Sequence, residues 1–268
     1  MYSASPAVPK KGHEDTDRGA SRPEEALCWI FCNGNRAPGR SSVSRCRERI
    51  TGCPRPSSTG RSPAERLAWF ITSEFYPHID HYIDLHGGAS LETLHPQVYY
   101  CGVTDEAVAR EARRMALATG FACLIRLTSH NLVTTCSYGG SQGIPCILME
   151  LGCAGVWSVE QREDYIRRVR SVLNAIGVIS APDLSGTCEP IELLDVSCAP
   201  SALDGCWLPC LAAGDTFRAG DLLGTVTDYF GVEKQRIVAE EDGIILYQRC
   251  SLGIPRGASP IVYGRRVG

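Results

Sequence analysis

The sequence predicts an α/β protein in which helices flank a sheet, with a smaller C-terminal all-β unit that forms a barrel or a sandwich. Strand-like and helix-like segments alternate over residues 62–184, which is typical of a sheet with helices on its faces. Over residues 185–268, short apolar runs are separated by Gly-Asp turns, and no helix-length periodic stretch remains. A chain of 268 residues has room for a medium and a small domain, so we expect their boundary near residue 184.

Residues 1–61 form a basic segment that we expect to be poorly ordered or altered. Residues 1–63 hold eleven Lys and Arg against six acidic residues, although the whole chain carries a net charge of -3. The segment is rich in Ser, Pro and Gly and poor in aliphatic residues, a composition that buries little apolar surface. The acidic balance of the whole chain argues against a nucleic-acid-binding protein.

Hydropathy and cysteine usage predict a cytoplasmic protein. No run approaches the roughly 18 apolar residues of a membrane span, and the N-terminus lacks the apolar core of a secretory signal. The 14 cysteines include no C-x-x-C pair, so a zinc ribbon is not indicated. We interpret the cysteines as reduced thiols that serve as small apolar residues.

The first helix of the α/β part is expected to begin at Ser62. The segment Ser62-Pro63-Ala64-Glu65 combines an N-cap Ser, a Pro at the first helical position and a Glu at the third. We expect Pro77 to end this helix. Its apolar side consists of Leu67, Phe70, Ile71 and Phe75.

The next segment, residues 81–86, alternates aliphatic and polar side chains, which predicts a strand. Its aliphatic residues would face one side of the sheet, and Asp84 and His86 the other. Two glycines then end the strand, so His86 lies at its carboxyl end, where open α/β sheets bind ligands.

Strands and helices continue to alternate after this point. We expect strands over 98–103, 121–127 and 145–151 and helices over 104–119 and 158–175. Thr104 is expected to cap the first of these helices, and Gly120 to follow its end. Ser158 and Gln161 form a capping box at the start of the second helix.

Three sets of side chains could carry chemistry. His86 at a strand end would make a good zinc ligand, and Asp84 on the same face could orient its ring. Glu150 ends an apolar strand, so partial desolvation would raise its pKa towards the working range of a general base. Asn35 and Arg36, in a loop rich in Gly and Pro, could bind a carboxylate through the guanidinium fork. The simpler interpretations are a capped or solvent-facing His, a locally salt-bridged Glu and an ordinary basic loop.

Taken in order along the chain, these residues resemble the succinylglutamate desuccinylase/aspartoacylase family, which is related to zinc carboxypeptidases. The resemblance rests on segments 82–88 and 143–152 and on the β-rich tail, which contains Gly214-Asp215, 220–224 and 239–246. It covers the chain from about residue 62 to the end. It implies a mixed sheet flanked by helices, as in zinc carboxypeptidases, followed by a β-rich unit.

The resemblance also implies a mechanism. In this family a zinc ion is held by the His and Glu of an early H-x-x-E motif and by a later His, which His86 matches. Glu150 matches the general base, which accepts a proton from the metal-bound water and returns it to the leaving amine. Asn35 and Arg36, with the Pro-Gly that follows, resemble the Asn-Arg pair that binds the substrate carboxylate.

Two functions stay open, because the sequence contains no H-x-x-E. The first is a zinc-dependent hydrolase that removes an N-acyl group from an amino acid or a small amine, with homo-oligomerisation left open. Its remaining zinc ligands could come from His13, Glu14, His78 or His81. The second is a non-catalytic, truncated or decayed family member without a complete zinc site. A carrier module is disfavoured, because Lys234 is not flanked by the Met or Ala typical of such hairpin tips.

Overall fold

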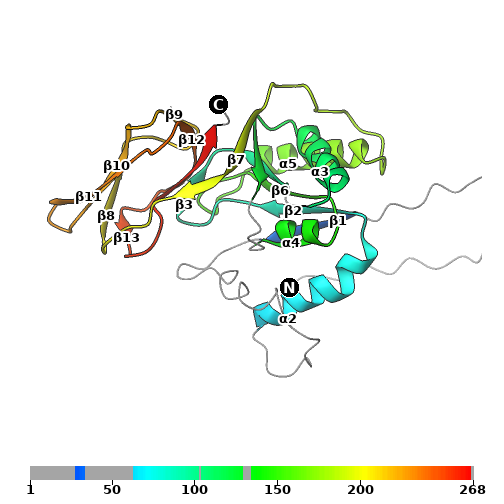
Figure 1. Ribbon diagram of the computed structural model, residues 1–268, viewed down its shortest axis with the longest axis horizontal. Coiled ribbons are helices and arrows are strands. Elements are labelled where there is room, and N and C mark those ends of the chain that lie inside the picture. The colour runs from blue at the N-terminus through cyan, green and yellow to red at the C-terminus, as the bar shows by residue number, and fades with distance from the viewer. Residues whose placement is uncertain (1–27, 34–62, 103, 129–133, 267–268) are drawn as a thin grey trace, which may run out of the picture.

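The computed structural model describes residues 28–33, 63–102, 104–128 and 134–266 (Figure 1). Within these residues a ten-stranded sheet carries helices on its faces, and a second sheet contains four strands. The large sheet combines parallel and antiparallel pairs. The predicted fold class, a mixed sheet flanked by helices with a further β-rich part, is therefore confirmed.

One half of the large sheet contains the strands that matter for the candidate site. In spatial order they are β1 (Cys28–Asn33), β2 (His81–His86), β6 (Cys146–Glu150), β4 (Gln97–Cys101), β5 (Cys123–Leu127) and β7 (Ile191–Cys198). Strands β1, β2 and β6 run parallel, whereas β4 runs antiparallel to β6 and parallel to β5. The four strands expected between residues 81 and 151 are confirmed, with slightly different ends. Strand β1 was not expected, because it lies in the basic segment.

The chain beyond residue 185 contributes strands to both sheets. The large sheet continues with β14 (Ile261–Arg266), β12 (Gly243–Arg249) and β3 (Glu92–Leu94), and β9 (Thr216–Phe217) pairs with β12. The small antiparallel sheet contains β11 (Glu233–Val238), β10 (Leu222–Thr227), β8 (Gly205–Pro209) and β13 (Gly253–Ile254). The described residues after 185 form strands and loops, as predicted. The domain boundary near residue 184 stays a prediction. Strands from both sides of residue 184 take part in the large sheet.

The helices divide between the two faces of the large sheet. They are α2 (Pro63–Phe70), α3 (Glu106–Ala118), α4 (Thr135–Ser141) and α5 (Val159–Ala175). Figure 1 shows α3 and α5 on one face and α4 on the other. In the described part of the chain, no helix is long and apolar enough to cross a membrane. The expected cytoplasmic location stays a prediction.

The apolar side expected for the first helix is partly wrong. Leu67 is 52% exposed and Phe70 is 46% exposed, whereas Ile71 is buried. Helix α2 passes at Ile71 into a π-helical turn, Ile71–Phe75, and then into a 3₁₀ turn, Tyr76–His78. A π turn has more residues per turn than an α-helix, so the faces before and after Ile71 do not align.

Helix caps account for where α3 and α5 begin. Asp105 caps α3 by accepting a backbone hydrogen bond from its first turn. The expectation that Thr104 is this cap was wrong, because the Thr104 hydroxyl donates instead to the Gly140 carbonyl at 2.7 Å. The capping box of Ser158 and Gln161 at the start of α5 is confirmed.

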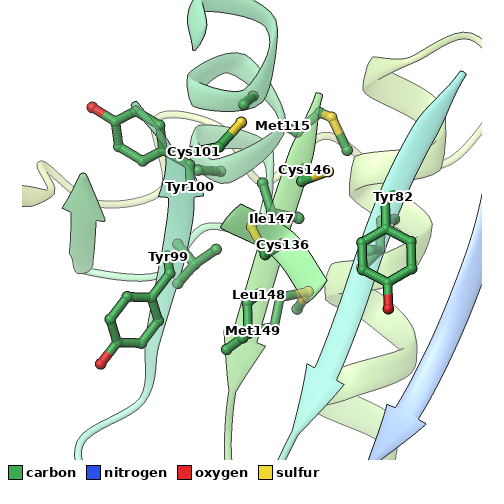
Figure 2. Close-up of a cluster of buried hydrophobic side chains, with 14 of the residues drawn as sticks. Tyr82, Tyr99, Tyr100, Cys101, Met115, Cys136, Cys146, Ile147, Leu148 and Met149 are labelled. Carbon is green, nitrogen blue, oxygen red and sulfur yellow. The ribbon is translucent and has the colours of Figure 1, made fainter. Parts of the chain in front are cut away.

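Two hydrophobic cores support these sheets. The larger core covers both faces of the large sheet, and Figure 2 shows the part of it where Cys136 of α4 meets Cys146 of β6. The smaller core includes Trp207 and Leu223. The cysteines recorded among the described residues are free thiols, and several of them are buried in the larger core. The buried thiols agree with their interpretation as small apolar residues, whereas Cys198, Cys210 and Cys250 are exposed.

Replacing Ser158 by Ala is expected to lower the free energy of unfolding by about 1 kcal/mol. The Ser158 hydroxyl accepts from the Gln161 backbone N–H at 3.2 Å, and the Gln161 side chain accepts from the Ser158 backbone N–H at 3.1 Å. Urea unfolding followed by circular dichroism measures the change. The control Ser158→Asp keeps an N-cap oxygen and should stay near the parent value. An equal loss in both variants would contradict the capping role.

Candidate functional site

Polar side chains form a row across three neighbouring strands of the large sheet, at the end where β2 and β6 finish and β4 begins. His86 ends β2 and is the register partner of Glu150, which ends β6. Gln97 begins β4 and pairs with Glu150 from the other side. Register partners on neighbouring strands point to the same face of a sheet, so these three residues share a face. Asp84, two residues before His86, faces the same way.

The imidazole of His86 lies between two carboxylates. Its Nε2 is 3.2 Å from Oδ1 of Asp84, and its Nδ1 is 3.4 Å from Oε1 of Glu150. All three side chains are largely buried, with exposed fractions of 13% for His86, 5% for Asp84 and 10% for Glu150. The Thr135 hydroxyl at the start of α4 donates to the second oxygen of Asp84. The site is therefore a compact cluster whose charged groups satisfy one another.

This environment determines the protonation of the His86 ring. Burial disfavours the charged ring and lowers its pKa, but the hydrogen bonds that the ring donates to Asp84 and Glu150 outweigh burial. Together they raise the pKa of His86 to about 9. At neutral pH the ring of His86 is thus protonated and lies between the side chains of Asp84 and Glu150.

Backbone hydrogen bonds fix the two strand ends that carry this cluster. The Leu151 N–H donates to the His86 carbonyl at 3.2 Å, and the Gly88 N–H donates to the Gly152 carbonyl at 3.0 Å. A Cβ atom on Gly88 would lie 2.8 Å from that carbonyl oxygen, so only glycine allows this approach. The Tyr165 hydroxyl of α5 donates to the His86 carbonyl. The two strand ends are therefore held at a fixed separation.

Of the other residues predicted for the site, some lie outside the described residues and His81 does not join this cluster. Asn35 and Arg36 lie outside the described residues, as do His13 and Glu14. His81 lies at the opposite end of β2, where its Nε2 is 3.3 Å from the Glu111 carboxylate. His81 is therefore separated from His86 by the length of the strand.

The described residues do not form a zinc site by themselves. Among them, no three His, Cys, Asp or Glu side chains are arranged to hold a metal ion. Zinc sites in proteins use three or four protein ligands. His86 supplies one imidazole, and both of its ring nitrogens face carboxylates. The described part of the chain thus fits one position of such a site rather than the whole set.

Two residues beside the cluster were not predicted from the sequence. Thr135 was missed because α4 was not expected, although Thr134 and Ser137 form a capping box at its start. Gln97 was missed because its place beside Glu150 depends on the pairing of β4 with β6. The position of Thr135 had a local signal in the sequence, the capping box of α4. The position of Gln97 depends on the register of β4 against β6.

Comparison with solved structures identifies the class of fold. The product-bound ectoine utilization protein EutE (DoeB) from Ruegeria pomeroyi has a TM-score of 0.67 at 19% identity, covering 78% of this chain and 66% of that chain. A succinylglutamate desuccinylase/aspartoacylase from Rhodobacter sphaeroides has a TM-score of 0.69 at 20% identity, covering 85% and 68%. A succinylglutamate desuccinylase from a Silicibacter species has a TM-score of 0.66 at 17% identity, covering 77% and 64%.

The chain therefore has the fold of the succinylglutamate desuccinylase/aspartoacylase structures, and the predicted resemblance is confirmed at the level of the fold. It spans about two thirds of the length of those structures. No family model and no curated protein matches the sequence.

In metal-free protein, the free energy of unfolding is expected to fall as the pH rises from about 6.5 to about 9. His86 is protonated in both states below its unfolded pKa, so its contacts with the two carboxylates contribute fully there. They are lost as the pH rises through the folded pKa of about 9. Urea unfolding at a series of pH values measures this.

Two variants separate this effect from the titration of other groups. His86→Gln should remove much of the pH dependence, whereas the control His78→Gln at an exposed position should keep it. A constant difference between the parent and His86→Gln over the whole pH range would contradict the assignment.

Proposed function

We propose that this chain acts as a hydrolase that removes an N-acyl group from an amino acid or a small amine. The observation that carries the proposal is the contact between His86 and Glu150 at the ends of two paired parallel strands. The similarity of the fold to proteins described as desuccinylases and an aspartoacylase supports the substrate class.

Glu150 is proposed as the general base. Its carboxylate accepts a proton from the attacking water and returns that proton to the leaving amine when the amide bond breaks. His86 holds one oxygen of this carboxylate, and Asp84 fixes the ring from its other nitrogen. Thr135 holds Asp84 in turn. The carboxylate is thereby kept in one orientation, as proton transfer requires.

Zinc stays part of the proposal on the strength of the resemblance. His86 is the proposed ligand within the described residues, and it would bind the metal through a ring nitrogen that gives up its proton and its carboxylate partner. These residues do not complete a ligand set. No step of the mechanism is therefore assigned to the metal. Asn35 and Arg36 stay proposed as the groups that bind the substrate carboxylate.

A non-catalytic relative is the second candidate. It is favoured by one observation, that both nitrogens of His86 are engaged by carboxylates while no three-ligand group exists among the described residues. In that case Asp84, His86 and Glu150 form a buried ion-pair cluster that stabilises the ends of β2 and β6.

Replacing Glu150 by Gln is expected to lower kcat for N-acetylated and N-succinylated amino acids by at least about a hundredfold. The amide keeps the size of the side chain but is far too weak a base to accept the proton. The assay measures amine release by full-length protein, with zinc per chain determined by elemental analysis.

Glu106→Gln is the matched control, because the Glu106 side chain is 91% exposed on α3. It should leave kcat unchanged. A folded parent protein with neither zinc nor hydrolysis would instead support the non-catalytic relative. Full activity in Glu150→Gln would exclude Glu150 as the base.

A further inference from the structure

The outer side of helix α5 carries exposed aliphatic side chains. Val159 is 53% exposed and Ile166 is 46% exposed, and a spacing of seven residues places both on one stripe of the helix. Another stripe of the same helix, which includes Val169 and Val172, packs inward in the larger core. The exposed aliphatic residues are therefore not the ones that attach α5 to the sheet.

Two charged residues of opposite sign flank Ile166 on the outer side. Glu163 precedes it by three positions and Arg170 follows it by four, so both neighbour Ile166 on the helix surface. Both residues are exposed. The outer side thus has an aliphatic centre, a negative group towards its start and a positive group towards its end. We refer to these residues as the α5 stripe: Val159, Glu163, Ile166 and Arg170.

The α5 stripe is complementary to a second copy of itself. When two copies of α5 pack antiparallel across a two-fold axis beside Ile166, the two Ile166 side chains meet, and Glu163 of each copy faces Arg170 of the other. A partner that carries one sign of charge would attract one of these two groups and repel the other. The charges therefore favour a second copy of this chain as the occupant of the stripe.

Exposed apolar side chains continue beyond both ends of the helix. Val156 and Trp157, just before α5, are 70% and 71% exposed, and Val178, just after it, is 39% exposed. Antiparallel packing brings the start of one α5 to the end of the other, so these apolar ends approach one another. They enlarge the contact, because the 17-residue helix is only about 26 Å long. A stable interface buries about 800 Å² on each partner.

We propose that the α5 stripe is the interface of a homodimer in which two copies of α5 pack antiparallel. The inference does not depend on the proposed hydrolase activity. Helices α5 and α4 lie on opposite faces of the large sheet (Figure 1), and Thr135 of α4 contacts Asp84 of the candidate site. Pairing through α5 therefore does not cover the face of the sheet that carries the site.

Analytical ultracentrifugation of the full-length protein, at chain concentrations from about 1 to about 100 µM, measures the dimer Kd. Ile166→Asp should raise this Kd at least about a hundredfold, because it places a charge at the centre of the interface twice in each dimer. The control Leu67→Asp changes a residue of α2 that is 52% exposed, and it should leave the Kd unchanged. A parent protein that stays monomeric at every concentration would overturn the inference, as would a parent-like Kd in Ile166→Asp.

Charge reversal tests the antiparallel pairing itself. Glu163→Arg alone or Arg170→Glu alone places like charges opposite each other, and each should raise the dimer Kd about tenfold. The double variant restores opposite charges across the axis, so its Kd should return close to the parent value. Circular dichroism of each variant checks that the helices remain folded. A double variant whose Kd rises by the product of the two single effects would overturn the pairing.

Discussion

The candidate site depends on the parallel pairing of β2 with β6 in one register. That register makes His86 and Glu150 partners and places both side chains on the face of Asp84, which Thr135 of α4 contacts. A slip by one residue would turn every side chain of one strand to the other face and separate the two groups. The Leu151 and Gly88 backbone hydrogen bonds oppose such a slip, because both join the strand ends just beyond the pair.

Charge burial makes the cluster and the sheet depend on one another. Removing one member of a buried ion pair leaves an uncompensated charge, which costs several kcal/mol. Here Asp84 and Glu150 are each within 3.4 Å of the His86 ring, and the Thr135 hydroxyl donates a further hydrogen bond to Asp84. The same contacts that stabilise the ends of β2 and β6 also fix the orientation of Glu150. The structural role and the proposed catalytic role therefore use the same contacts.

Local patterns in the sequence predicted the parts of this picture that local forces determine. Alternation over residues 81–86 placed His86 at a strand end, and the capping box at Ser158 placed the start of α5. The strand register arises from contacts between distant segments, which one sequence does not reveal. The exposed Leu67 shows the same limit, since a change of helix type altered the buried face.

A double-mutant cycle of His86→Gln and Glu150→Gln in metal-free protein at pH 7 tests the central contact most directly. Urea unfolding of the parent, both single variants and the double variant gives the coupling free energy. The account predicts a favourable coupling of about 1–3 kcal/mol, because the pair is buried and hydrogen-bonded. Effects that add to within about 0.5 kcal/mol would contradict it, since residues in contact with a shared charge do not behave independently.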